Sequence, residues 1–112
     1  MKIPDVSIAG AGPASLLLAA SCAERGLVVT VIAPAPEARW LANYAGWWDE
    51  FTPLHSTGFI EQTWISPLIH TDAHERKDLD RRYAKLSTPA LQAWLRVRCI
   101  KAGVNFVRAS VV

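Results

Sequence analysis

The sequence has little of what would tie it to a disulfide scaffold, a metal centre or a membrane. Its two cysteines, Cys22 and Cys99, lie far apart and outside a C-x-x-C spacing, which favours free thiols in a reducing, cytoplasmic setting. The most apolar stretch of the first predicted helix, Leu16 to Ala23, is far shorter than the roughly twenty residues that span a bilayer. Any membrane contact would therefore be peripheral.

Neither the charges nor the histidines indicate a nucleic-acid or metal partner. The net charge is +2 with 20% charged residues, and the densest charged run, residues 72–82, mixes both signs as a solvated surface does. His55, His70 and His74 lack a metal-ligand spacing, and polar neighbours favour a loop around the last two. We expect no metal ion and no nucleic-acid partner.

What the sequence does contain is a strand, a glycine turn, a helix and a second strand, one after another. Residues 3–9 and 28–33 are apolar, and the turn Gly10-Ala11-Gly12-Pro13-Ala14-Ser15 follows the first of these stretches. This order is the opening βαβ unit of a Rossmann-like, FAD- or NAD(P)-binding fold. We therefore predict an α/β fold with a parallel sheet.

The turn residues are predicted to hold a diphosphate. Gly10 can make a sharp turn without a Cβ penalty, and Gly12 lets the diphosphate approach the main chain. The start of the helix adds free N–H donors and a partial positive charge. The predicted cofactor-binding residues here and at the end of the second strand are Gly10, Ala11, Gly12, Pro13, Ala14, Ser15 and Ala33. Ser15 replaces the usual third glycine, and the alternative is a βαβ unit that no longer binds a nucleotide.

The second predicted strand ends without the acidic residue that usually holds the ribose. It ends Val31-Ile32-Ala33-Pro34. Glu37 could reach a ribose only if the loop over residues 34–36 bends back. The alternative is that Glu37 is a solvated loop charge.

The middle of the chain has the least regular pattern. We predict a loop with a short helix for the aromatic segment over residues 40–51, and a strand or irregular edge interrupted by Pro67 over residues 59–69. Residues 71–80 are polar and read as a loop. Residues 79–86 read as a short extended stretch.

The last part of the chain predicts a second helix and a final strand. The helix begins at Ser87 or Thr88 and ends at Gly103. Its apolar face holds Leu91, Trp94, Leu95 and either Val97 or Cys99. Residues 104–112 then read as a strand, which we expect to lie beside the first strand of a three-stranded parallel unit.

The length limits how much of a flavoprotein the chain can hold. With 112 residues and 51% hydrophobic content, it has room for one small domain with a core and is not generally disordered. A complete FAD-binding domain of the monooxygenase type needs later strands and a substrate sheet. We therefore interpret residues 1–112 as the N-terminal part of a single FAD/NAD(P)-binding domain, or as a truncated relative.

Three segments resemble the lycopene cyclases, flavoproteins that close the β or ε rings on lycopene. Residues 42–51 (Ala-Asn-Tyr-Ala-Gly-Trp-Trp-Asp-Glu-Phe) resemble the family's Asn-Tyr-Gly-Val-Trp-x-Asp-Glu stretch. Residues 81–86 (Arg-Arg-Tyr-Ala-Lys-Leu) resemble its Arg-Ala-Tyr-Gly-Arg-Val stretch, and residues 91–106 resemble its helix, Cys, Gly-Val and strand. The resemblance covers essentially the whole chain, in the family's order.

The chain departs from the family's pattern at several positions. Ala45 and Ala84 replace glycines, Gly46 replaces a valine, and Thr88 stands where many relatives have a flavin-holding arginine. Each lost glycine could forbid a backbone conformation. The family's acidic catalytic motif lies beyond Val112, so no catalytic residue is assigned.

The resemblance implies a carotenoid substrate, FAD as cofactor and NAD(P)H as its reductant. The implied reaction is a non-redox isomerisation in which lycopene ends cyclise through a carbocation, and aromatic and acidic residues could line such a site. The implied candidates are Tyr44, Trp47, Trp48, Asp49 and Glu50. The alternative is that Trp47 and Phe51 are core anchors and that Asp49 and Glu50 are solvated. Arg81 and Lys85 could neutralise flavin phosphates, Lys85 with a surface role as the alternative.

The same resemblance implies a chain that is inactive alone, with the cyclase activity belonging to a complete protein. Two other functions stay open. One is part of an FAD-dependent oxidoreductase or hydroxylase of the same superfamily, and the other is a nucleotide-binding module without catalysis.

Overall fold

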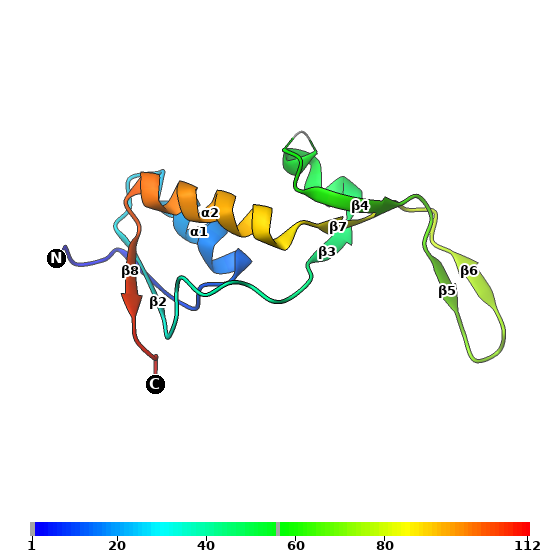
Figure 1. Ribbon diagram of the computed structural model, residues 1–112, viewed down its shortest axis with the longest axis horizontal. Helices are drawn as coiled ribbons and strands as arrows, with labels where there is room; N and C mark the ends of the chain where they lie inside the picture. Colours follow the sequence, from blue (N-terminus) through cyan, green and yellow to red (C-terminus); the bar gives the residue numbers. More distant parts are fainter. Residues whose placement is uncertain (1, 56) are drawn as a thin grey trace. The chain divides into compact units, whose positions relative to one another are not determined.

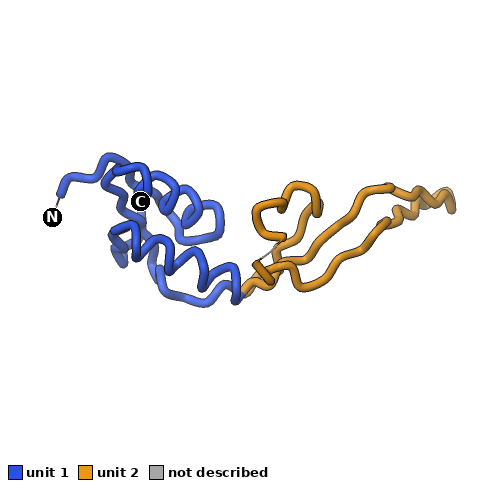
Figure 2. Tube along the Cα trace, turned by 90° about the horizontal axis from the view of Figure 1, so that it is seen from above, with its two compact units in different colours: residues 1–40, 89–112 blue, residues 41–88 orange. Residues whose placement is uncertain are grey.

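The computed structural model describes residues 2–55 and 57–112, which divide into two compact units. Figure 1 shows the helices and strands along the chain, and Figure 2 colours the two units differently. Unit 1 holds the chain up to Trp40 and again from Pro89 onward, and unit 2 holds residues 41–88. Unit 2 is therefore inserted in sequence between two halves of unit 1.

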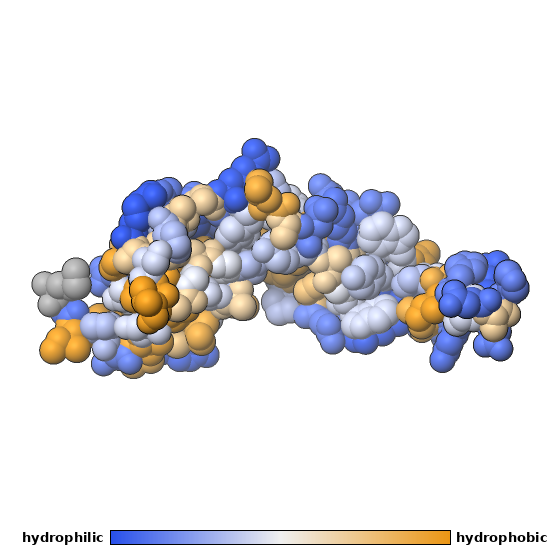
Figure 3. All heavy atoms as spheres, turned by 90° about the horizontal axis from the view of Figure 1, so that it is seen from below, coloured by the Kyte–Doolittle hydropathy of each residue, from blue (hydrophilic) through white to orange (hydrophobic). Residues whose placement is uncertain are grey.

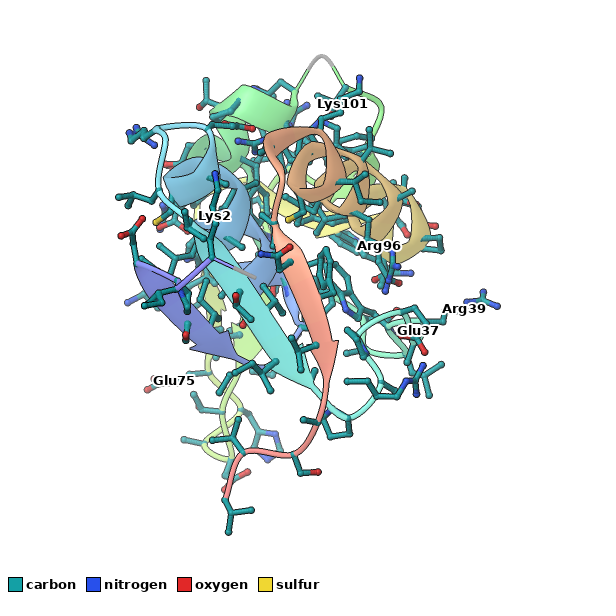
Figure 4. All side chains as sticks on the ribbon, turned by 90° about the vertical axis from the view of Figure 1, so that its left-hand side faces the viewer. Lys2, Glu37, Arg39, Glu75, Arg96 and Lys101 are labelled. Carbon is teal, nitrogen blue, oxygen red and sulfur yellow. The ribbon has the colours of Figure 1, made fainter. Side chains whose placement is uncertain are left out.

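Unit 1 contains a parallel three-stranded sheet. Its strands are β1 (Val6–Ala9), β2 (Val29–Ala33) and β8 (Asn105–Arg108), in the order β1-β2-β8. Helices α1 (Pro13–Ala23) and α2 (Thr88–Ala102) connect them, and Figure 4 shows both helices on the same face of the sheet. The predicted α/β fold with a parallel sheet is confirmed.

The last strand does not lie where the sequence analysis expects it. β8 pairs with β2, from Thr30 opposite Asn105 to Ala33 opposite Arg108, and not with β1. In a doubly wound sheet the third strand is added outside the second, because each right-handed crossover steps in the same direction. The expected position beside β1 is wrong.

Helix α1 begins and ends close to its sequence signals. Pro13 is its first residue, and the chain leaves the helix through Gly26, which has a φ of +91°. Pro13 suits the first turn because its missing N–H would have no partner within the helix. Three residues of the buried face, Leu16, Ala19 and Ala20, have no exposed surface, so the small alanines let the helix approach the sheet closely.

Helix α2 buries Cys99 and not Val97. Leu91, Leu95 and Cys99 are buried, whereas Val97 is 49% exposed. The Cys99 thiol donates a hydrogen bond to the carbonyl of Leu16 over 3.3 Å, which joins the two helices. Burial raises the pKa of the Cys99 thiol, so it stays protonated and apolar in character.

Unit 2 contains two small antiparallel sheets and a 3₁₀ helix. The first sheet has the order β3-β7-β4, from strands Ala45–Trp47, Tyr83–Leu86 and Ile60–Trp64, and η1 (Trp48–Leu54) follows β3. The second sheet is a hairpin of β5 (Leu68–His70) and β6 (Arg76–Asp78). Pro67 separates β4 from β5, as the sequence predicts.

The predicted loop over residues 71–80 is only partly a loop. Its last part contains β6, in which every residue is exposed. Because both faces of this hairpin are exposed, its sequence carries no alternation of apolar and polar residues from which a strand could be predicted. His74, at a φ of +61°, lies in the connection between β5 and β6.

Apolar side chains are exposed on both units. Ile3 and Leu41 are 90% exposed, and Ile65 is 78% exposed. Figure 3 shows hydrophobic groups on the presented face of each unit. Within residues 2–55 and 57–112, no helix has the length and hydropathy needed to cross a membrane.

Candidate nucleotide-binding site

The glycine turn joins the end of β1 to the start of α1. Gly10 has a φ of +107°, and its N–H donates to the carbonyl of Ile32 in β2 over 2.8 Å. This φ is readily accessible only to glycine. Gly12 is the N-cap of α1, with extended backbone angles of −84° and −175°. The chain therefore turns at Gly10, and α1 begins directly after Gly12.

The two glycines differ in the space around them. A Cβ at Gly10 would lie 3.5 Å from the Ser15 hydroxyl, whereas a Cβ at Gly12 would have no atom within 4 Å. Ser15 therefore contacts the Gly10 side of the turn and leaves Gly12 uncovered. This open main chain is what a diphosphate needs in order to reach backbone amides.

The first turn of α1 has the charge and the donors of an anion site. No side chain caps the helix, and its first turn has no acidic residue. Pro13 has no N–H, so the amides of Ala14 and Ser15 are the donors that the first turn itself can offer. The partial positive charge of the helix N-terminus acts in the same direction.

A tryptophan and a glutamine hold the turn from the side. The Trp40 indole donates from Nε1 to the carbonyl of Ala11 over 2.8 Å. The Trp40 amide donates to Oε1 of Gln92 over 2.9 Å, and Gln92 donates from Nε2 to the carbonyl of Ala38 over 2.8 Å. Gln92 is 8% exposed. Nothing in the sequence pattern singles out these two residues, because the contacts join segments that lie far apart in the chain.

At the ribose end of the site, the nearest candidate carboxylate is already paired. Ala33 is buried, and its carbonyl accepts a hydrogen bond from Ala109. Glu37 forms an ion pair with Arg108, the residue opposite Ala33 in β8. Figure 4 shows Glu37 and Arg39 on the loop after β2, on the side where Arg96 of α2 also lies. Glu37 is thus a half-exposed, paired loop charge.

Arg81 belongs to unit 2, where two acidic residues engage it. Its Nε and Nη2 donate to both carboxylate oxygens of Asp49 over 2.9–3.3 Å, and Glu50 lies 3.5 Å from Nη2. The guanidinium also lies 4.6 Å from the centre of the Trp47 ring. Asp49 and Glu50, each with a side chain 62% exposed, are therefore solvated partners of Arg81.

Aromatic side chains gather on the first sheet of unit 2. Trp47 and Trp64 flank Tyr83 from the two neighbouring strands, with ring centres 5.3 Å and 6.2 Å from the tyrosine. His55 stacks on Trp48 with ring centres 3.5 Å apart, and its Nε2 bonds to the Trp48 carbonyl. In the described part of the chain, no three His, Cys, Asp or Glu residues group as metal ligands would.

A solved structure shares this fold. The flavin-dependent brominase superposes on 97% of the chain with a TM-score of 0.63, at 16% sequence identity, over 30% of its own length. At this identity the likeness concerns the fold alone.

Known protein sequences are similar to this chain over nearly its whole length. The chain is 34% identical to lycopene beta cyclase of Nicotiana tabacum over 110 residues and 35% identical to capsanthin/capsorubin synthase of Capsicum annuum over 108 residues. These alignments cover 98% and 96% of the chain, which spans 22% of the length of each relative. Their names place the relatives in the chloroplast and the chromoplast, so they do not support the cytoplasmic expectation.

The family comparison covers nearly the whole chain and agrees with the three resembling segments. The description "Lycopene cyclase protein" matches residues 5–112. The chain belongs to the lycopene cyclase protein family.

Proposed function

We propose that this chain binds the ADP half of FAD and is the N-terminal part of a lycopene-cyclase-like flavoprotein. The observation that carries the proposal is the open main chain at Gly12, directly before an uncapped helix in a parallel βαβ unit. Membership of the lycopene cyclase family and the fold shared with a flavin-dependent enzyme support flavin over other nucleotides.

The residues present fit a diphosphate. The amides of Gly12, Ala14 and Ser15 would donate to its oxygens, and the α1 N-terminus would add favourable charge. Ala11 and Pro13 shape the turn, and Gly10 supplies its positive φ. The backbone of the turn thus does the binding.

The ribose would be held without the usual carboxylate. Ala33 has no side-chain acceptor, and Glu37 is engaged by Arg108. We therefore propose that affinity in this half of the site comes mainly from the diphosphate contacts. Replacing Glu37 would leave that affinity unchanged, because its carboxylate does not serve the ribose.

Both units would belong to one FAD-binding domain, with unit 2 as an insertion between β2 and α2. This proposal rests on the single family match across residues 5–112. Arg81 would contact a flavin phosphate only after its hydrogen bonds to Asp49 are broken. Lys85, paired with Glu61 over 2.8 Å, would likewise have to leave its partner.

The complete protein would act on a carotenoid, with NAD(P)H as reductant and with peripheral membrane contact. When bound, the reduced flavin would supply the electron density that assists protonation of a terminal double bond and stabilises the carbocation. Trp47, Trp64 and Tyr83 offer aromatic faces of the kind that stabilise cations. The chain would be inactive alone, since it spans 22% of its relatives' length.

Flavin binding can be tested directly on the purified chain. We expect FAD fluorescence to change on titration with the chain, and excess ADP to reverse the change, because both ligands would use the glycine turn. The Glu37→Gln variant is the matched control and should bind as the wild type does. A chain that binds neither FAD nor ADP would instead be a family member without a nucleotide site.

A further inference from the structure

The contact between Trp40 and Ala11 has a consequence for the neighbouring amide. The peptide between Ala11 and Gly12 is trans, as are all peptide bonds in the described chain. In a trans peptide the carbonyl and the following N–H point in opposite directions. A bond that fixes the Ala11 carbonyl toward the Trp40 indole therefore fixes the Gly12 N–H toward the other side of the peptide plane.

The Gly12 amide is one of the donors proposed for the diphosphate. Pro13, the first residue of α1, has no N–H to give. The Leu16 amide already donates to the Gly12 carbonyl over 3.0 Å. In the proposed site, the amides of Gly12, Ala14 and Ser15 meet the diphosphate. Of these, Ala14 and Ser15 are oriented by the helix, whereas Gly12 lies at its N-cap and depends on the turn.

Gln92 keeps the indole in place. It accepts from the Trp40 amide and donates to the Ala38 carbonyl, so both ends of its side-chain amide are bound to the loop that carries the tryptophan. Gln92 lies on α2 and is buried. These bonds anchor the loop that carries Trp40 to α2, and they hold the indole in its contact with the turn. All of these residues belong to unit 1.

We propose that Trp40 is a positioning residue for the diphosphate site, which orients the Gly12 amide through its indole N–H, with Gln92 as its anchor. The role of Trp40 in ligand binding rests on the proposed function. The orientation of the Gly12 amide is a property of the ligand-free chain and is independent of that proposal.

The test compares Trp40→Phe with Trp94→Phe in the 112-residue chain. Both variants lose an indole N–H in unit 1, but Trp94 lies on α2, where its ring contacts the Arg98 guanidinium. ADP titration should show a dissociation constant about fivefold higher for Trp40→Phe, the loss expected for one hydrogen bond. Trp94→Phe should bind ADP as the wild type does.

A ligand-free readout separates positioning from stability. In ¹H–¹⁵N spectra without ADP, the Gly12 amide resonance should shift in Trp40→Phe and in Gln92→Leu, and stay unchanged in Trp94→Phe. An unchanged Gly12 resonance in a folded Trp40→Phe variant would overturn the proposal, as would unchanged ADP affinity. If the wild type fails to bind ADP, the proposed function and the ligand role of Trp40 both fail, whereas a failure confined to the Trp40 comparison leaves the proposed function standing.

Discussion

At the residue scale, Gly10 and Gly12 serve two different physical needs within one turn. Gly10 is fixed at a φ of +107° by the turn and by its bond to Ile32. Gly12 has a φ of −84°, which any residue can adopt. A Cβ at this position would meet no neighbouring atom within 4 Å. Glycine at position 10 therefore allows the backbone conformation of the turn, whereas glycine at position 12 leaves the main chain accessible.

This difference predicts opposite effects of two alanine substitutions on stability. Gly10→Ala should lower the free energy of unfolding by about 1–3 kcal/mol, the cost of a strained backbone conformation. Gly12→Ala should lower it by less than about 1 kcal/mol, because alanine is only a poorer N-cap. Urea unfolding of both variants measures the difference. Equal losses would contradict the assignment of Gly10 to the fold.

The sequence identifies the residues of the turn but not those that hold it. Glycine, proline and the flanking apolar runs are local signals, so the turn could be predicted from residues 3–33 alone. Trp40 meets the turn through a contact across 29 positions of the chain, and Gln92 meets Trp40 across 52 positions. Such contacts depend on the path of the chain in three dimensions, which no local spacing encodes.

At the element scale, α1 and α2 are joined by an ion pair next to their buried contact. Arg98 donates from Nε and Nη2 to the two carboxylate oxygens of Glu24 over 2.9 Å and 2.8 Å. Hydrogen bonding from Arg98 is the main cause that lowers the pKa of Glu24, against a smaller effect of burial. The same pair raises the pKa of Arg98, with the Glu24 hydrogen bond again as the largest cause.

The direction of the Glu24 shift predicts how this contact depends on pH. Because the pKa is lower in the folded chain than its ordinary 4.5, the pair stabilises the fold above that value. The stabilisation is lost as pH falls through the folded pKa. We expect Glu24→Gln to lower the melting temperature at neutral pH and to reduce its further fall between about pH 5 and about pH 3.

The matched control is Glu37→Gln, which removes a carboxylate from the loop after β2 and leaves the contact between α1 and α2 in place. Melting curves of the three proteins, followed by circular dichroism across this range, give the comparison. An acid dependence that is the same in the wild type and in Glu24→Gln would contradict the stabilising role of the pair.

The elements differ in how far the sequence predicts them. Helices α1 and α2 have proline near their starts, and glycine follows each helix with a positive φ, at Gly26 and Gly103. The position of β8 beside β2 could not be read from its own residues, because an apolar strand pairs equally well at several places in a sheet. Strand β6 has no apolar face at all and carries no signal.

At the scale of the whole molecule, the chain contains an opening βαβ unit and an inserted unit, and it spans 22% of its relatives' length. The parallel sheet and both helices belong to unit 1, and the aromatic sheet belongs to unit 2. The family could be recognised from three segments because their residues resemble the family's stretches in the same order along the chain. The site could be only partly predicted, since Glu37 and Arg81 have charged partners, Arg108 and Asp49, that their own segments do not reveal.

The central claim is that open backbone amides at Gly12 bind a diphosphate, and calorimetric titration of ADP tests it most directly. The wild-type chain and Gly12→Ala should both fold, with circular dichroism as the control. We predict that the wild type binds ADP and that the alanine methyl group weakens binding by about tenfold or more, because it occupies the approach to the main chain. Equal ADP affinity in the two folded proteins would contradict the account.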